Sequence, residues 1–284
     1  MRNSFNSRLA KYIAMQILGG IAVILWLVPL YSMLINGFKT NFEATGTPVL
    51  IPPRTLTLSA YAAVWSSLKG PIINSFIVAM ASAALSSVLG ALGAYFFYVV
   101  GDKHPKISNT GFALIALGTF IPVESTAIPL IYLESGLGVY NSYLGLILAN
   151  LVFYVPTAAL LMSIFMPVVP KTLIEAARID EASDWAIFWK VMFPLLVPGF
   201  LSTLIFVFIQ SWNNFFIPVL LVKSPSLTLV SVGERLFTGG YGTLYNETFA
   251  AAVLASIVPL AVFILLGRYF IRGLAALGGG GKGV

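Results

Sequence analysis

The chain has 284 residues, of which 58% are hydrophobic and only 9% are charged, with a net charge of +6. Soluble globular domains carry roughly 25% charged residues, so this composition excludes a soluble globular protein and indicates one that crosses a membrane several times. The absence of cysteine from the sequence excludes disulfides and thiolate chemistry. The single histidine, His104, lies in a short polar loop and is expected to be solvated.

Six long apolar stretches follow one another along the chain. Each has about 20 residues or more with few charges, which is enough to cross a hydrocarbon core of about 30 Å. Because backbone groups in lipid must be satisfied within the segment, each stretch is expected to be a helix. The spans are placed at residues 13–36, 72–100, 109–132, 143–166, 199–221 and 249–270. The expected fold is an all-α polytopic membrane protein in which residues 1–284 form a single transmembrane domain.

The positions of the basic residues predict the orientation in the membrane. With six spans, both termini lie on the same side. Of the 16 lysines and arginines, only five lie in the loops on the other side, namely Lys39, Arg54, Lys69, Lys223 and Arg235. Lysine and arginine accumulate in short cytoplasmic loops, so both termini are expected in the cytoplasm.

A charged segment at residues 167–198 separates the fourth and fifth spans, on the side of the termini. Its charged residues are Lys171, Glu175, Arg178, Asp180, Glu181, Asp184 and Lys190. Thr172 and Glu175 have the spacing of a capping box, so a short helix is expected to begin near Thr172. Ser183 is expected to cap a second helix that ends before Pro194. The segment therefore predicts a helix, a turn and a helix outside the lipid.

Glu124 is the one ionisable residue well inside a predicted span, where a charge is costly and requires a reason. Pro122 and Pro129 flank it and interrupt the helical hydrogen bonds, which is tolerated in lipid only where the backbone faces protein or water. We therefore place Glu124 on the wall of a water-filled cavity. The alternatives are a position near the external interface or pairing with neighbouring helices.

A second polar group, made of Gln210, Trp212, Asn213 and Asn214, lies in the fifth span. Gln210 and Asn214 are four residues apart and would share a helix face, with Asn213 alongside. Amides between helices can serve only as packing contacts, worth about 0.6 to 2 kcal/mol each. Several amides beside an aromatic ring also suit a sugar, whose hydroxyls take hydrogen bonds while the ring stacks. This group is expected to line a polar substrate pathway, with helix packing as the alternative.

No catalytic, nucleotide-binding or metal motif is recognisable in the sequence. Uphill transport would therefore draw its energy from another protein or from an ion gradient. An ion-coupled secondary transporter is one alternative, but such carriers use several intramembrane carboxylates and only Glu124 qualifies. A membrane enzyme acting on lipids is another, and it would need Asp180, Glu181 and Asp184 as metal ligands.

The charged segment also has a recognisable spacing, formed by Glu175, Ala176 and Ala177, then the position of Glu181, then Val191, Phe193 and Pro194. This spacing resembles the E-A-A-x3-G-x9-I-x-L-P loop of ABC importer permeases, most closely the carbohydrate-uptake permeases of the maltose-transporter type. Further similar stretches are Phe38 to Thr40, Asn74 to Ala79, Ile121 with Pro122, Ile128 to Leu130, Leu137 to Ser142 and Ser211 to Phe215. The resemblance thus covers nearly the whole chain.

The resemblance implies a non-catalytic permease subunit in a bacterial or archaeal cell (inner) membrane. The implied partners are a second homologous permease, a cytoplasmic ATPase dimer, an external solute-binding protein, membrane lipid and a carbohydrate substrate, with no nucleic acid. The substrate would be a disaccharide, an oligosaccharide or a related polyol, with glycerol phosphate as the non-sugar alternative. No cofactor is expected on this chain, because ATP and Mg would bind the ATPase.

By the same resemblance, the loop is a coupling helix that contacts the ATPase through Glu175, Ala176, Ala177, Asp180 and Glu181. The family usually has glycine at the position of Glu181, where the turn favours a positive φ. Either Glu181 adopts that conformation at a cost of about 1 kcal/mol or more, or the turn is built differently.

Overall fold

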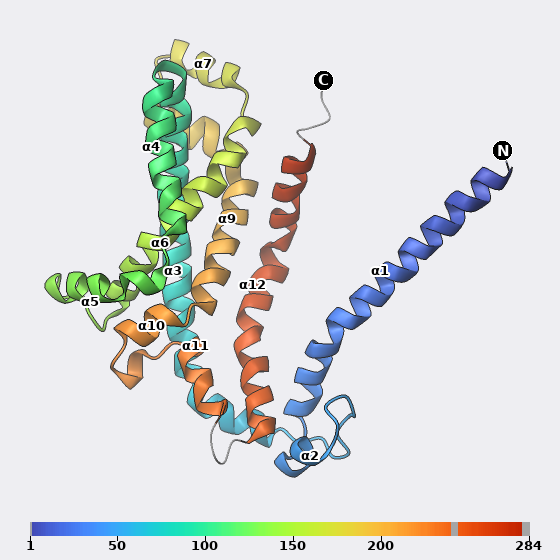
Figure 1. Cartoon of the computed structure of the whole chain (residues 1–284). Helices are drawn as coiled ribbons and strands as arrows, with labels where there is room; N and C mark the ends of the chain where they lie inside the picture. The colour runs from blue at the N-terminus through green and yellow to red at the C-terminus, as the bar shows by residue number, and fades with distance from the viewer. Residues whose placement is uncertain (1, 240–243, 280–284) are drawn as a thin grey trace. The chain divides into compact units, whose positions relative to one another are not determined.

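The structure is a computed structural model that describes residues 2–239 and 244–279. All regular elements in this part of the chain are helical (Figure 1). The α-helices are α1 (Arg2–Gly37), α2 (Asn41–Gly46), α3 (Ser59–Lys103), α4 (Pro105–Leu117), α5 (Ala127–Gly136), α6 (Tyr143–Phe165), α7 (Lys171–Ile179), α8 (Asp184–Ala186), α9 (Phe193–Asn213), α10 (Phe216–Leu221), α11 (Val230–Gly233) and α12 (Tyr245–Gly279).

The chain divides into two compact units. The first comprises residues 1–68 and 234–256, and the second comprises residues 69–233 and 257–284. Both α3 and α12 contribute to each unit. In the second unit, α7 lies at one end of α9, and α10 and α11 lie at the other (Figure 1).

Five of the described helices are long and apolar enough to cross a membrane, and there are six if one bent pair counts as a single span. The five are Lys11–Gly37, Ser59–Val99, Tyr143–Val168, Asp184–Asn213 and Tyr245–Tyr269, and the bent pair is Pro105–Phe120 with Val123–Gly136. The expectation of an all-α polytopic membrane protein is therefore confirmed.

The third predicted span, residues 109–132, is not one helix. α4 ends at Leu117, a short 3-10 turn follows, and the chain direction changes by 93° before α5. Pro122 has no N–H to continue a helix and disfavours helical geometry in the residue before it. The expectation that the prolines interrupt the helical hydrogen bonds is confirmed, and the predicted span consists of two helices rather than one continuous helix.

The fifth predicted span, residues 199–221, is displaced. One continuous helix runs from Asp184 to Asn213 and consists of α8, a π-helical segment at Ile187–Met192 and α9. The expectation that the loop's second helix ends before Pro194 is therefore wrong. A proline ring clashes with the carbonyl of the fourth residue before it, and the wider π turn lets the helix continue past Pro194. The helix ends at Asn213, and α10 begins separately.

In the second unit, α3 and α6 approach each other closely at Gly90. A Cβ atom on Gly90 would lie 2.6 Å from the carbonyl carbon of Ala158 and 2.7 Å from the backbone nitrogen of Ala159. Gly93, one turn further along α3, has nothing within 4 Å of such an atom. Gly90 therefore allows backbone contact between two helices, and Gly93 has no such role.

In the first unit, a buried lysine organises the segment after α1. Lys39 is fully buried, and its ammonium donates hydrogen bonds to Thr47 Oγ1 at 3.1 Å and to the Pro48 carbonyl oxygen at 3.3 Å. Its own carbonyl accepts from the Asn246 amide at 3.2 Å. Glu43 Oε1 accepts the Arg54 N–H at 2.6 Å. These hydrogen bonds connect residues within 37–54 and join this segment to the start of α12.

We predict that Gly90→Ala lowers the free energy of unfolding by about 1–3 kcal/mol, because the added methyl group overpacks the contact between α3 and α6. The matched control, Gly93→Ala, should leave stability unchanged or raise it by up to about 1 kcal/mol, since alanine favours helix. Thermal unfolding of the purified protein in detergent compares the two. Equal changes in both variants would contradict the close approach.

Candidate functional site

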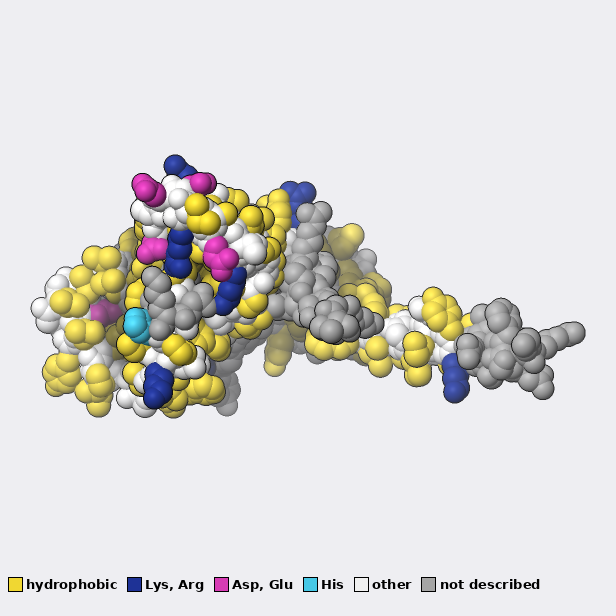
Figure 2. Space-filling view, turned by 90° about the horizontal axis from the view of Figure 1, so that it is seen from above, with side chains coloured by type: hydrophobic (Ala, Val, Ile, Leu, Met, Phe, Trp, Pro, Cys, Tyr) yellow, Lys and Arg dark blue, Asp and Glu magenta, His cyan; other side chains and the backbone are white. Residues whose placement is uncertain are grey.

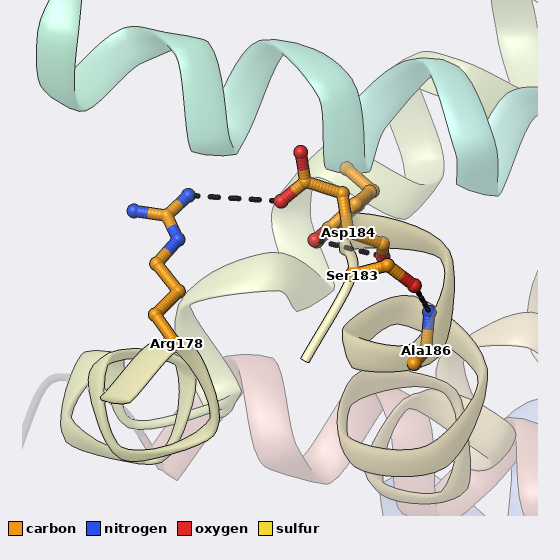
Figure 3. A network of polar contacts seen from close by, with 5 residues as sticks. Arg178, Ser183, Asp184 and Ala186 are labelled. Atoms are coloured by element: carbon orange, nitrogen blue, oxygen red, sulfur yellow. Dashed lines mark hydrogen bonds and ion pairs between the residues drawn. The ribbon is translucent and has the colours of Figure 1, made fainter. Parts of the chain in front are cut away.

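The charged loop begins with α7, which starts close to the expected position but without the expected cap. α7 begins at Lys171, with Pro170 as its N-cap residue and no side-chain capping bond. Thr172 therefore lies inside the first turn, and the predicted capping box with Glu175 is wrong. The second expected cap is confirmed, because Ser183 Oγ accepts the Ala186 N–H at 3.3 Å (Figure 3).

The turn after α7 requires a left-handed residue. Glu181 has φ of 54°, and its N–H donates to the Arg178 carbonyl oxygen at 3.1 Å. The Ala182 N–H donates to the Ala177 carbonyl oxygen at 3.0 Å. This pair of bonds is a Schellman motif, in which glycine is the preferred residue at the position of Glu181. Of the two alternatives for this turn, the strained glutamate is the one observed.

A weak ion pair also crosses the turn. Arg178 and Asp184 approach to 4.0 Å between Nη2 and Oδ1, with 35% and 72% of their side chains exposed (Figure 3). Solvent screens such a pair, which contributes at most about 1 kcal/mol. The backbone bonds, rather than this pair, hold the turn.

The inner side of the loop packs into a buried apolar cluster. Ile174 from α7 and Ile187, Phe188 and Met192 from the π segment are buried against the ends of α3 and α6. The contributing residues of α3, of α6 and of the turn that follows α6 are Ala91, Ala94, Tyr95, Met162, Phe165, Met166 and Val169. The Tyr95 hydroxyl donates to the Asp184 carbonyl oxygen at 3.3 Å. Buried apolar packing and a hydrogen bond therefore hold the loop against the helices, in addition to its chain connections.

The outer side of the loop presents exposed apolar and charged side chains. Leu173, Ile179 and Trp185 are 43%, 82% and 63% exposed. Among the predicted contact residues, Glu175, Ala176, Asp180 and Glu181 are exposed, whereas Ala177 is half-buried against the apolar cluster. Viewed from this end, acidic and basic side chains gather over the region of α7 (Figure 2). Ala176, rather than Ala177, is therefore the small residue on the open face.

The predicted pathway residues lie at the far end of α9, not in the middle of a span. Gln210 and Asn213 are exposed on one face of the helix together with Phe206, which is 36% exposed. Trp212 is only 4% exposed and its ring centroid lies 5.8 Å from that of Phe208. The expected aromatic stacking surface beside the amides is therefore absent at Trp212, because its ring packs inside the helix bundle.

Asn214 has a structural position. Its Oδ1 accepts the N–H of Ile217, in the first turn of α10, at 3.0 Å, and its Nδ2 donates to the Tyr154 hydroxyl at 3.1 Å. Its carbonyl oxygen accepts from Ser231 Oγ at 2.8 Å. Because α9 ends before it, Asn214 does not share a helix face with Gln210, contrary to expectation.

Glu124 lies at the bend between α4 and α5, in the short turn Val123–Thr126 that contacts α10. Its side chain is exposed, so it is not paired inside this chain's own helix bundle. A role for Glu124 on a cavity wall stays a prediction.

Two of the buried polar residues that were not predicted, Asn150 and Glu134, lie on helices of the second unit. Asn150 in α6 donates to Ser82 Oγ at 3.1 Å and to Ser211 Oγ at 2.9 Å, so one amide joins α3, α6 and α9. A lone asparagine within an otherwise apolar span is the sequence signal for such a bridge.

The second is Glu134 in α5. It is 2% exposed, and neither carboxylate oxygen has a hydrogen-bond partner among the described residues. A Cβ atom on Gly145 would lie 2.6 Å from Glu134 Oε2, so the absence of a side chain there leaves room for the carboxylate. Glu134 lies two residues beyond the predicted third span, which is why it was taken for a loop residue.

Residues 88–276 match the family described as "Binding-protein-dependent transport system inner membrane component". The chain is 55% identical to the glucose import system permease protein GlcU of Saccharolobus solfataricus, over 93% of each protein. It is 31% identical to the arabinooligosaccharides transport system permease protein AraQ of Halalkalibacterium halodurans, over 90% of this chain and 91% of that protein. It is 30% identical to the sn-glycerol-3-phosphate transport system permease protein UgpE of Yersinia pestis, over 89% and 92%.

Solved structures show the same fold. A chain of a bacterial ABC transporter involved in the import of the acidic polysaccharide alginate aligns with a TM-score of 0.69 at 19% identity, covering 93% of this chain and 97% of that one. A chain of the MetNI methionine ABC transporter, in inward-facing conformations, aligns with a TM-score of 0.61 at 17% identity, covering 75% and 98%.

We predict that Glu181→Gly raises the free energy of unfolding by about 1 kcal/mol, because glycine adopts a positive φ without steric cost. Asp180→Gly is the matched control, since Asp180 has φ of −76° and gains nothing from glycine. Thermal unfolding of both variants provides the comparison. A destabilised Glu181→Gly variant would show that the glutamate side chain contributes more than its backbone strain costs.

Proposed function

This chain belongs to the family of inner-membrane components of binding-protein-dependent transport systems, and from that premise we propose that it is a permease subunit of an ATP-driven carbohydrate importer. The observation that carries the proposal is the exposed face of α7, fixed at the end of a bundle of apolar helices. An exposed surface with Leu173, Ala176 and Ile179 beside acidic residues suits a protein partner outside the lipid.

The partner that supplies energy would be a cytoplasmic ATPase dimer, which binds ATP and Mg in place of this chain. This assignment requires α7 to face the cytoplasm, in agreement with the expected position of both termini. A second permease subunit would complete the translocation path, and an external solute-binding protein would deliver the sugar. The relevant membrane is the bacterial or archaeal cell (inner) membrane.

One continuous helix supports a mechanical route for this coupling. The second half of the charged loop and α9 are one helix of 30 residues, which is about 45 Å long. The same helix has its first turns in the apolar cluster beside α7 and carries Gln210 and Asn213 at its other end. Displacement of α7 by the ATPase would therefore tilt this helix as a rod and move the exposed amides.

The similarity to a glucose import permease makes glucose the first substrate to test, ahead of the di- or oligosaccharide expected from the sequence. The similarity to a glycerol phosphate permease makes that solute the second. Co-purification of the binding protein, followed by identification of its ligand, distinguishes them. Uptake by the isolated chain driven by an ion gradient would instead establish a secondary transporter.

We predict that Glu175→Arg combined with Ala176→Trp reduces ATPase co-purification and sugar uptake about tenfold or more, because interface hot spots contribute about 2 kcal/mol or more. The chain should remain in the membrane in normal amounts. Ala113→Trp, the same change at an exposed alanine of α4, is the matched control and should affect neither measurement. Normal ATPase binding by the double variant would reject the coupling surface.

We predict that Gln210→Ala and Asn213→Ala each reduce sugar uptake about five- to tenfold with normal complex assembly, since a lost hydrogen bond costs about 1–1.5 kcal/mol. Asn214→Ala is the contrast: it should lower thermal stability, because it removes the bond to the first turn of α10 and the bond to Tyr154. Uptake kinetics and thermal unfolding separate the two effects. Unchanged kinetics in both exposed variants would leave these amides without a transport role.

A further inference from the structure

A buried polar bridge joins three long helices of the second unit. Asn150 of α6 is 3% exposed, and its amide donates to Ser82 Oγ of α3 at 3.1 Å and to Ser211 Oγ of α9 at 2.9 Å. Both serines are buried as well. All three residues lie within helices that are long and apolar enough to cross a membrane. The bridge therefore places two directional contacts where helices otherwise pack mainly through apolar side chains.

The amide of Asn150 is only partly satisfied by this bridge. Asn150 Oδ1 is buried and has no hydrogen-bond partner among the described residues. A buried acceptor without a partner costs free energy, and an apolar side chain of similar size, such as leucine, would avoid that cost. The best-attested use of a buried polar group of this kind is to fix how helices are aligned with one another.

Ser211 lies on the face of α9 opposite the exposed amides. Successive residues of an α-helix are rotated by about 100°, so Gln210 and Asn213 lie about 100° and 160° from Ser211 around the axis. Ser211 is 4% exposed, whereas both amide side chains are exposed. Asn150 thus binds α9 at the back of the same short stretch that carries the two proposed pathway residues.

α3 and α6 form a fixed support for this contact. Their backbones approach closely at Gly90 and Ala158, which lie about two turns beyond Ser82 on α3 and Asn150 on α6. Beside Ser211, the other buried side chains of α9 are apolar, and apolar contacts are non-directional. A hydrogen bond weakens steeply when it is misaligned, so the bond to Ser211 restrains the rotation of α9 as apolar packing does not.

We propose that Asn150 is a positioning residue, which fixes the rotation of α9 about its axis through Ser211 and thereby directs Gln210 and Asn213 toward the substrate pathway. This inference rests on the proposed pathway role of these two amides. Asn150 itself is buried and does not contact the sugar. One amide inside the bundle then determines the direction of two amides on its surface.

Cysteine labelling tests the rotation directly, because the chain contains no cysteine. Asn213→Cys places a thiol on the exposed face, and Val207→Cys places one on the buried face, where Val207 is 0% exposed. In the purified full chain, a maleimide should react faster at position 213 than at position 207. Adding Asn150→Leu or Ser211→Ala should slow the reaction at 213 and speed it at 207, because α9 rotates.

Two control variants accompany this measurement. Ser86 is as buried as Ser82 on α3, but its hydroxyl has no hydrogen-bond partner among the described residues, so Ser86→Ala should leave both labelling rates unchanged. Tyr154→Phe removes the bond from Asn214, which follows the last residue of α9, and should also leave them unchanged. Unchanged rates in Asn150→Leu and Ser211→Ala would overturn the proposal. Faster labelling at both positions would also overturn it, since it indicates general loosening rather than rotation.

Glucose uptake by the assembled complex tests the consequence for transport. Asn150→Leu and Ser211→Ala should each raise the KM about fivefold, as expected for one lost hydrogen bond. The double variant should be no worse than Asn150→Leu alone, because both changes act through the same bond. A rotated α9 with an unchanged KM would reject the pathway role of Gln210 and Asn213 while supporting Asn150 as the residue that orients α9, so the two failures are distinguishable.

Discussion

The attachment of a charged loop to apolar helices is the constraint on which the rest of the structure depends. Ile187 and Phe188 are almost completely buried against the ends of α3 and α6, so the inner side of the loop belongs to the same core as the spans. Because the inner side of the loop is buried against these helices, α7 stays attached to the bundle while its charged and small residues are exposed. Position and exposure, the two properties that a docking surface needs, both follow from this one cluster.

The fold class was predictable because the bilayer restricts the possible structures more strictly than water does. Long apolar runs must be helices in lipid, and charged segments must leave it, so hydropathy alone predicted an all-helical membrane protein, although the bounds of the third and fifth spans differ from those predicted. Local chemistry also predicted the Ser183 cap, because a serine cap depends only on neighbouring backbone. At Glu181 the usual glycine of the resembling family pointed to a positive φ, and the backbone has it.

The errors occur where the outcome depends on contacts distant in sequence. Pro194 was expected to end a helix, but a π segment carries the helix past it. Asn214 was read as one more polar residue of a span, yet its bonds to α10, Tyr154 and Ser231 end α9 there. Ala177 was assigned to the contact surface from the family resemblance, and Trp212 was assigned to the pathway because it lies among the amides, but neither argument says what a side chain packs against. The partners of Asn150 are distant in sequence, and the burial of Glu134, whose carboxylate has no hydrogen-bond partner among the described residues, is likewise visible only in the folded chain.

The π segment at Ile187–Met192 also determines how the residues that follow it are rotated about the helix axis. A π turn holds an extra residue relative to an α turn, and one residue corresponds to about 100° of rotation around a helix. The direction in which Gln210 and Asn213 point around the helix axis, relative to α7, therefore depends on the π segment, which lies more than 15 residues before them. Deleting a single residue within the π segment would restore α-helical hydrogen bonding there. The side chains of Gln210 and Asn213 would then be rotated by about a quarter of a turn around the helix axis.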